Sequence, residues 1–268
     1  MNSASTVAGA FDRARAQGRA AVIAYLPAGF PDKKTSIRLI RAIADQGVDM
    51  VEVGIPYSDP VMDGPVICQA AEIALAGGTT TADALDVVRE TSGRGAAILI
   101  MSYWNLIDAY GPGRFAEELA AVGGAGTITP DLTPEEGEGW IADCDARGLS
   151  HVFLAALSSD EERLRTVSAA STGFVYAASL MGVTGVRAAV GGGAPELVAR
   201  LRQVTGTPVS VGLGVSTGQQ AREVAGYADG VIVGSAFVKR VLEAPDSDAA
   251  ELAVSELARE LVTAVQRP

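Results

Sequence analysis

The chain is poor in the residues that metal and redox sites require. Among 268 residues, cysteine occurs only at Cys68 and Cys144, and histidine only at His151. Without a C-x-x-C pair or a second histidine, the sequence predicts no zinc site. We expect His151, which opens a predicted strand, to be structural, because barrel active sites lie at the opposite ends of strands. The separated cysteines and the lack of a secretory apolar segment predict a reducing, cytoplasmic location.

Positive charge and long apolar runs are also scarce. Lysine and arginine together number 21 against 32 aspartates and glutamates, which gives a formal net charge of -11. Because nucleic acids and anionic membranes are bound through basic patches, neither is expected as the main partner. No apolar run is long enough for a membrane span. The lysines lie only in predicted helices or at their starts, which excludes a Schiff-base lysine at a strand end; they are Lys33, Lys34 and Lys239.

What the chain does contain is an alternation of short β-branched segments with amphipathic stretches, and 48% of its residues are hydrophobic. This alternation predicts parallel strands joined by helices. Eight strands are expected, at 21–26, 50–55, 97–102, 126–130, 151–156, 174–179, 208–213 and 230–234. Helices are expected near 33–46, 81–91, 112–122, 134–147, 160–170, 194–205, 217–227 and 251–265. Eight such units in about 250 residues predict an α/β fold, a (β/α)8 TIM barrel that forms a single domain over residues 1–268.

A doubly wound open sheet is the competing fold. That fold usually carries a G-x-G-x-x-G turn after its first strand, whereas this chain has Pro27-Ala28-Gly29-Phe30-Pro31 there. The barrel is therefore favoured. Barrel sites are built from the loops at the C-terminal ends of the strands, so these loops are the places to search.

Glycines gather after the sixth, seventh and eighth predicted strands, in segments 182–185, 212–216 and 234–235. Glycine lets the backbone approach a ligand with its N–H groups, and a helix beginning at Ser235 would add its positive N-terminal end. Any one of these glycines could instead serve a tight turn. The three segments together favour a phosphate site that uses neither lysine nor arginine.

Two carboxylates and a phenol are placed to reach the same barrel mouth. Glu52 lies in an apolar strand, where an unpaired charge costs roughly several kcal/mol unless the residue lines a wet cavity. Asp63 lies in the following loop, and Tyr176 lies on the sixth predicted strand. General acid and base chemistry needs the two carboxylates to differ, with Glu52 the one of raised pKa and Asp63 the ionised one. Asp63 could instead be a turn or helix N-cap residue before Pro65.

The run Val51-Glu52-Val53-Gly54-Ile55-Pro56-Tyr57-Ser58-Asp59-Pro60-Val61-Met62-Asp63-Gly64-Pro65 resembles the signature of the tryptophan synthase α chain family. The resemblance extends along nearly the whole chain. Further segments fall where that family has them: Pro130-Asp131-Leu132, Tyr176 through Gly182-Val183-Thr184-Gly185, Gly212-Leu213-Gly214 and Gly234-Ser235.

The resemblance implies a barrel that cleaves indole-3-glycerol phosphate into indole and glyceraldehyde 3-phosphate. Glu52 would protonate indole C3 and take the proton from the side-chain hydroxyl, while Asp63 would accept the indole N1–H. Tyr176 would assist or position the substrate. Since the protonated indole ring accepts the electron pair of the breaking bond, neither a metal nor a cofactor is expected.

The resemblance also implies the substrate subsites. Gly185, Gly214, Gly234 and Ser235 would hold the phosphate, and Met101, Ile128 and Leu213 are candidates for the indole walls. Segment 180–193 is expected to be a mobile lid, whose closure would bring Thr184 to Asp63. Three positions depart from the family pattern and affect pocket polarity or loop shape, namely Thr127, Thr129 and Leu157.

A partner is implied as well, a pyridoxal phosphate-bearing β chain in an α2β2 assembly that receives indole through a tunnel. The candidate docking loops are residues 56–59 and 103–110, the latter because exposed aromatics suit an interface; these aromatics could instead pack within the loop. Two other classes stay open. One is a stand-alone indole-3-glycerol phosphate lyase that releases free indole, and the other is a non-catalytic phosphate-binding barrel, which the presence of both Glu52 and Asp63 excludes if the two meet.

Overall fold

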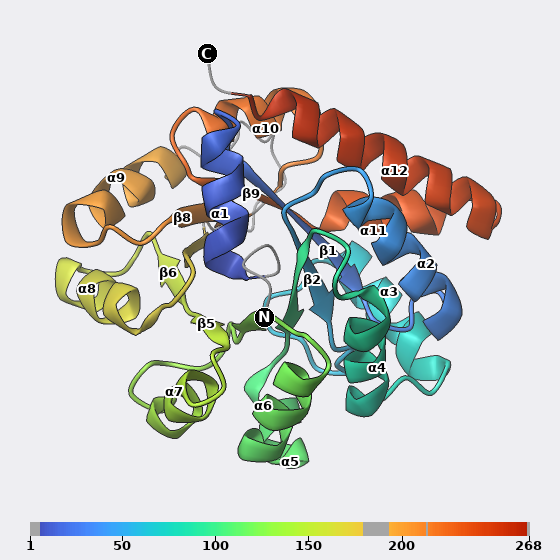
Figure 1. The fold of residues 1–268 in the computed structure, drawn as a ribbon, viewed down its shortest axis with the longest axis horizontal. Helices are drawn as coiled ribbons and strands as arrows, with labels where there is room; N and C mark the ends of the chain where they lie inside the picture. Colours follow the sequence, from blue (N-terminus) through green and yellow to red (C-terminus); the bar gives the residue numbers. More distant parts are fainter. Residues whose placement is uncertain (1–5, 179–192, 213, 267–268) are drawn as a thin grey trace.

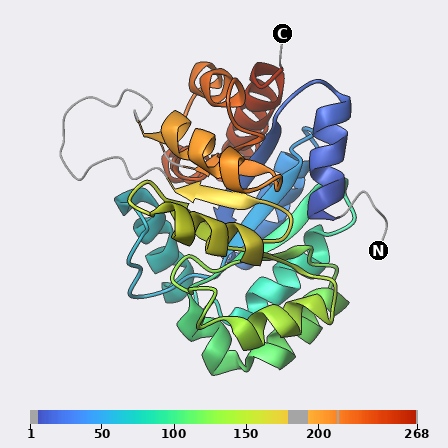
Figure 2. The ribbon, with the colours of Figure 1, turned by 90° about the vertical axis from the view of Figure 1, so that its left-hand side faces the viewer.

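The protein folds as a nearly closed barrel of parallel strands inside a ring of helices (Figures 1 and 2). The computed structural model describes residues 6–178, 193–212 and 214–266. The strands are β1 (Ala21–Pro27), β2 (Met50–Gly54), β3 (Ala97–Met101), β4 (Gly126–Ile128), β5 (Ser150–Val152), β6 (Leu154–Ala156), β7 (Val175–Ala178), β8 (Val209–Gly212) and β9 (Gly230–Val233). The predicted TIM barrel is confirmed.

Nine strands appear where eight were predicted because the fifth is divided at Phe153. Its first part, β5, pairs with β4, and its second part, β6, pairs with β7. The hydrogen-bonded order is β5-β4-β3-β2-β1-β9-β8-β7-β6, so the ring closes through the continuous chain between β5 and β6. All eight predicted strands are present, and their C-terminal ends lie at one end of the barrel.

Twelve helices are formed by the described residues. They are α1 (Val7–Ala16), α2 (Lys33–Ala44), α3 (Pro65–Ala76), α4 (Thr81–Thr91), α5 (Trp104–Tyr110), α6 (Pro112–Ala121), α7 (Glu138–Asp145), α8 (Glu161–Ala170), α9 (Ala194–Val204), α10 (Gly218–Ala225), α11 (Ser235–Glu243) and α12 (Ser247–Ala264). The eight expected helices are present, and α11 begins at Ser235 as predicted. Three helices, α1, α3 and α5, were not predicted. No helix in the described ranges has the length and apolar character needed to cross a membrane.

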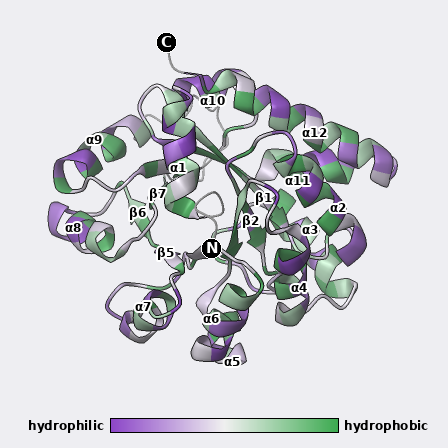
Figure 3. Cartoon of the chain, viewed as in Figure 1, coloured by the Kyte–Doolittle hydropathy of each residue, from purple (hydrophilic) through white to green (hydrophobic). Residues whose placement is uncertain are grey.

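The alternation of side chains along each strand produces two separate apolar cores. One lies between the sheet and the helices and includes Val22, Val51 and Ile98. The other fills the barrel and includes Ile23 and Leu99. Hydropathy colouring agrees with this division, since the central strands are mostly green while the outer helices mix green and purple (Figure 3).

Helix α1 closes the N-terminal end of the barrel (Figure 1). Four of its residues, including Phe11, belong to the same apolar cluster as the inward-facing strand residues. The Phe11 ring lies 5.8 Å from that of Phe174, centroid to centroid. Near this end Asp49 forms a buried ion pair with Arg19. The barrel is therefore plugged at one end, which leaves only the other end for a site.

Candidate functional site

A cavity of about 380 Å³ opens at the C-terminal ends of the strands, the end opposite α1. Most predicted site residues line it together. They are Glu52, Asp63, Met101, Tyr176, Gly214, Gly234 and Ser235, from β2, β3, β7 and the segments after β2, β8 and β9. Residues far apart in the sequence thus meet at one place because parallel strands all end on the same side.

Glu52 lies in the wall of this cavity and is only 1% exposed. Its Oε1 atom has no hydrogen-bond partner among the described residues. Burial raises the pKa of Glu52 from 4.5 to about 8, since the charged form loses water without gaining a counter-charge. At neutral pH this carboxyl is therefore mostly protonated and available as an acid.

Asp63 reaches the cavity from the loop before α3. The residue that caps α3 is Gly64, which has no side chain to bond the helix, so Asp63 is not the N-cap. Burial raises the pKa of Asp63, and a hydrogen bond from Tyr103 opposes part of this rise. The Tyr103 hydroxyl also accepts the backbone N–H of Met62 at 3.0 Å. Tyr103 thus holds the loop that carries Asp63 over the cavity.

Three of the four residues expected to hold the phosphate line the cavity, namely Gly214, Gly234 and Ser235. Gly214 has φ +74°, a conformation that glycine adopts without strain, and Gly234 is the N-cap of α11. Ser235 is the first residue of this nine-residue helix. Because Gly234 and Ser235 line the same cavity as Tyr176 and Glu52, the positive N-terminal end of α11 lies at this cavity.

Tyr176 is one of two tyrosines that lie over glycines at the cavity wall. A Cβ atom on Gly212 would lie 2.6 Å from Cζ of Tyr176, and one on Gly54 would lie 2.7 Å from Cζ of Tyr25. Both distances are shorter than side-chain atoms tolerate. The absent side chains at these glycines are what allow the rings to come this close to the backbone of the neighbouring strand.

Some predicted residues are not part of this cavity. Ile128 pairs in register with Met101 and belongs to the interior core, but it does not line the cavity formed by the described residues. Thr127, one of the departures expected to affect pocket polarity, instead lies beside the Cys144 thiol of α7, on the helix side of the sheet. Gly185, Thr184, Leu213 and most of segment 180–193 lie outside the described residues.

Sequence reasoning also missed several cavity residues. They are Tyr25, Val61, Met62, Ile67, Leu154, Ala178, Val215 and Ile232. Apolar residues in strands are indistinguishable from core residues until the depth of each strand is known. Tyr25 was the detectable case, since it is a polar-tipped residue next to the C-terminal end of the first predicted strand.

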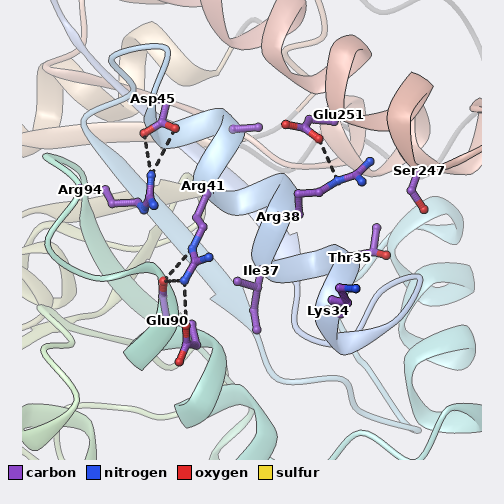
Figure 4. Close-up of a pocket in the computed structure, with 11 residues that line it drawn as sticks. Lys34, Thr35, Ile37, Arg38, Arg41, Asp45, Glu90, Arg94, Ser247 and Glu251 are labelled. Carbon is purple, nitrogen blue, oxygen red and sulfur yellow. Dashed lines mark hydrogen bonds and ion pairs between the residues drawn. The ribbon is translucent and has the colours of Figure 1, made fainter.

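A larger groove of about 700 Å³ lies outside the barrel, where α2 faces α4 and α12 (Figure 4). Its arginines are engaged by acids: Arg38 with Glu251, Arg41 with Glu90, and Arg94 with Asp45. These exposed ion pairs fasten neighbouring helices to each other. All three acids that line the groove are taken up by these ion pairs, and no glycine lines it, so the barrel mouth is the candidate active site.

Comparison with known proteins agrees with the geometry. The family model described as "Tryptophan synthase alpha chain" matches residues 11–266, which include every residue of the cavity. The chain belongs to the tryptophan synthase α chain family. The α chain of Thermobifida fusca (strain YX) is 58% identical over 256 residues, covering 94% of this chain and 95% of that relative. The Streptomyces coelicolor α chain is 56% identical over 254 residues, covering 94% of both chains.

Solved structures extend this likeness to the fold of the α chain family. A chain of tryptophan synthase from M. tuberculosis, in its open form, has a TM-score of 0.90 at 45% identity and covers 98% of this chain and 99% of its own. The α subunit from Legionella pneumophila has a TM-score of 0.87 at 31% identity and covers 99% and 98%. The barrel fold is thus shared even with the Legionella pneumophila chain, in which about two-thirds of the aligned residues differ from those of this chain.

The two loops expected to dock a partner of this α chain touch each other beside the cavity. The Asn105 side-chain amide donates to the Tyr57 hydroxyl at 3.5 Å, and the Tyr57 and Tyr103 rings lie 5.2 Å apart. Tyr103 is buried, so the expectation of exposed aromatics is wrong for this residue, which instead packs within the loop. Val61 and Met62, at 78% and 43% exposed, are the exposed apolar residues of this rim.

Proposed function

We propose that Glu52 and Asp63 carry out in this chain the reaction of its family, the cleavage of indole-3-glycerol phosphate to indole and glyceraldehyde 3-phosphate. The observation that carries this proposal is Glu52 itself, a buried carboxyl of raised pKa in the wall of a cavity that it shares with Asp63, with no partner for its Oε1 among the described residues. An unpaired buried carboxyl costs stability and is retained where chemistry needs it.

The first step is protonation of indole C3 by the neutral carboxyl of Glu52. The N1 electron pair joins the ring, so positive charge develops at N1, where Asp63 accepts the N1–H and stabilises that charge. The Glu52 carboxylate then takes the proton of the side-chain hydroxyl next to C3. The carbon–carbon bond breaks, its electron pair returns to the indole ring, the aldehyde forms, and Glu52 is protonated again.

The phosphate of the substrate is proposed to bind at Gly214, Gly234 and Ser235. Backbone N–H groups and the N-terminal end of α11 would supply the positive field in a chain whose net charge is -11. Gly185, which the family resemblance adds to this set, lies outside the described residues. Tyr176 and Met101 would contact the indole side of the substrate across the cavity.

The partner that we propose is a β subunit of tryptophan synthase, which carries pyridoxal phosphate and takes up the indole, in an α2β2 assembly within the cytoplasm. The rim made by Tyr57, Val61, Met62 and Asn105 is the proposed docking surface. Exposed apolar side chains beside the cavity would be covered by such a partner. Residues 1–268 are proposed to act as one barrel domain.

An indole-release assay with purified chain, with and without a cognate β chain, tests this function. We expect slow indole release from indole-3-glycerol phosphate by the chain alone and faster turnover with the β chain. Equal release with and without the β chain would support the alternative of a stand-alone lyase. No release in either case, with intact fold, would contradict the proposed reaction.

A further inference from the structure

Tyr25 is a cavity residue to which the reaction as described gives no role. It lies near the C-terminal end of β1 and pairs in register with Glu52 on β2. Its side chain lines the cavity and is otherwise buried, at 7% exposed. A buried phenol without a polar partner loses the hydrogen bonds that water would give it, which costs about 1–3 kcal/mol. A tyrosine at this position therefore calls for a partner that phenylalanine would not need.

The Tyr25 ring lies between the proposed phosphate subsite and the two carboxyls. At one end, a Cβ on Gly234 would lie 3.5 Å from Cβ and Cδ1 of Tyr25, an ordinary packing distance. At the other end, the hydroxyl and the adjacent ring edge cover Gly54, two residues beyond Glu52. A substrate held by its phosphate near Gly234, with its indole ring near Glu52 and Asp63, must pass its three-carbon chain across this ring.

The state of the Tyr25 hydroxyl is fixed by its surroundings. Burial, followed by the charges of Asp63 and Glu52, raises the pKa of Tyr25 well above its ordinary value. The phenol therefore stays protonated throughout the working pH range. It can donate a hydrogen bond but cannot act as a base, which distinguishes its chemistry from that of Glu52.

We propose that Tyr25 is a specificity-determining residue whose hydroxyl donates a hydrogen bond to a hydroxyl of the glycerol chain of the substrate. This inference rests on the proposed function. Gly54 leaves the space into which the ring extends, and Gly234 packs against the other end of the Tyr25 side chain. The bond would orient the glycerol chain so that the hydroxyl next to indole C3 faces Glu52.

The test compares Tyr25→Phe with the wild-type chain on two ligands, the substrate and indole-propanol phosphate, which has the indole and the phosphate but no glycerol hydroxyls. Tyr25→Phe removes one oxygen and keeps the ring. We expect kcat/KM for indole-3-glycerol phosphate to fall by about 3- to 12-fold, the effect of one neutral hydrogen bond. The inhibition constant of indole-propanol phosphate should stay within about twofold.

Tyr227→Phe is the matched control. Tyr227 has a buried hydroxyl without a partner among the described residues, but it lies beside α9 and α10, outside the barrel. This variant should leave both ligands unaffected. Two results would overturn the inference: an unchanged kcat/KM in Tyr25→Phe, or an equal loss for substrate and inhibitor, which would mean that the ring acts only by packing. Absence of cleavage in the wild-type chain would instead refute the proposed function.

Discussion

Two buried carboxylates three residues apart show how differently the two ends of the barrel are built. Asp49, which precedes β2, is 2% exposed and receives hydrogen bonds from both Nη atoms of Arg19, at 2.5 and 2.9 Å, and from the Val22 N–H at 2.8 Å. Glu52, within β2, is 1% exposed and leaves Oε1 without a partner among the described residues.

The difference lies in what each end of the barrel must do. At the closed end an ion pair with full hydrogen bonding can be buried, and it fastens the segment before β1 to the segment before β2. At the open end, the same full hydrogen bonding would leave the carboxyl unable to hold and transfer the proton that the reaction needs. A carboxylate that the fold leaves unpaired is thus a candidate for chemistry, and a paired one is a candidate for structure.

The largest expected effect comes from replacing the unpaired member. Glu52→Gln keeps the size and neutral charge of the protonated side chain but cannot transfer the proton. We expect indole release to fall by about 10³-fold or more while the fold and phosphate binding are retained. Glu72→Gln, an exposed change on α3, is the control. Retention of most of kcat in Glu52→Gln would remove Glu52 from the mechanism.

Replacing the paired member should give the opposite result. Asp49→Asn leaves Arg19 buried without a counter-charge, so the free energy of unfolding should fall by about 3 kcal/mol. Activity per folded molecule should persist. Denaturant titration measures the loss, with Asp45→Asn, an exposed partner of Arg94, as a control expected to change stability by less than about 1 kcal/mol. Equal stability losses in both variants would mean that burial does not distinguish these pairs.

The pH dependence of stability gives a third comparison. Because the folded-state pKa of Glu52 is raised to about 8, its neutral form stabilises the fold fully below its ordinary value of 4.5. This contribution is lost as the pH rises toward and through 8. Between pH 5 and pH 9, the free energy of unfolding of the wild type should fall by on the order of 2 kcal/mol relative to that of Glu52→Gln. Water in the cavity keeps this loss below the full value that the pKa shift would give. Parallel stability curves for the two proteins would contradict the raised pKa.

The smallest expected effect concerns the loop that carries Asp63. Tyr103→Phe removes the hydrogen bonds to Met62 and Asp63, so the pKa of Asp63 should rise further. We expect a loss of about 3- to 10-fold in kcat/KM and a shift of the acidic limb of the pH profile to higher pH. Tyr57→Phe, on the neighbouring loop, should leave that limb in place. An unshifted limb in Tyr103→Phe would separate Tyr103 from the ionisation of Asp63.

Much of the barrel could be predicted because each strand carries its own pattern. The alternation of β-branched and amphipathic segments located all eight strands, whereas the division of the fifth at Phe153 depends on pairing with two different neighbours. Helix α3 was missed because its apolar residues, from Val66 to Leu75, surround the helix instead of forming a stripe. Helix α1 precedes the first strand, outside the repeating unit that guided the prediction.

The candidate site was predictable where a residue conflicted with its surroundings. A carboxylate in a run of valines revealed Glu52, and clustered glycines revealed Gly214 and Gly234. Apolar residues that suit a strand gave no such signal, so Leu154 and Ile232 were missed. Thr127 was assigned to the pocket although its neighbour Ile128 faces the interior, which by alternation turns Thr127 outward.

The pairing of a tyrosine with a glycine on the adjacent strand, Tyr25 with Gly54 and Tyr176 with Gly212, makes these positions interdependent in evolution and in design. An alanine at either glycine would collide with the ring beside it, whereas a smaller residue at either tyrosine would leave the glycine unharmed. Changes should therefore occur in a fixed order, ring first and glycine second. In a redesigned barrel, space can be opened at either tyrosine without a change at its glycine, with loss of the role proposed for that tyrosine, and covarying substitutions at these pairs should appear among the relatives of this chain.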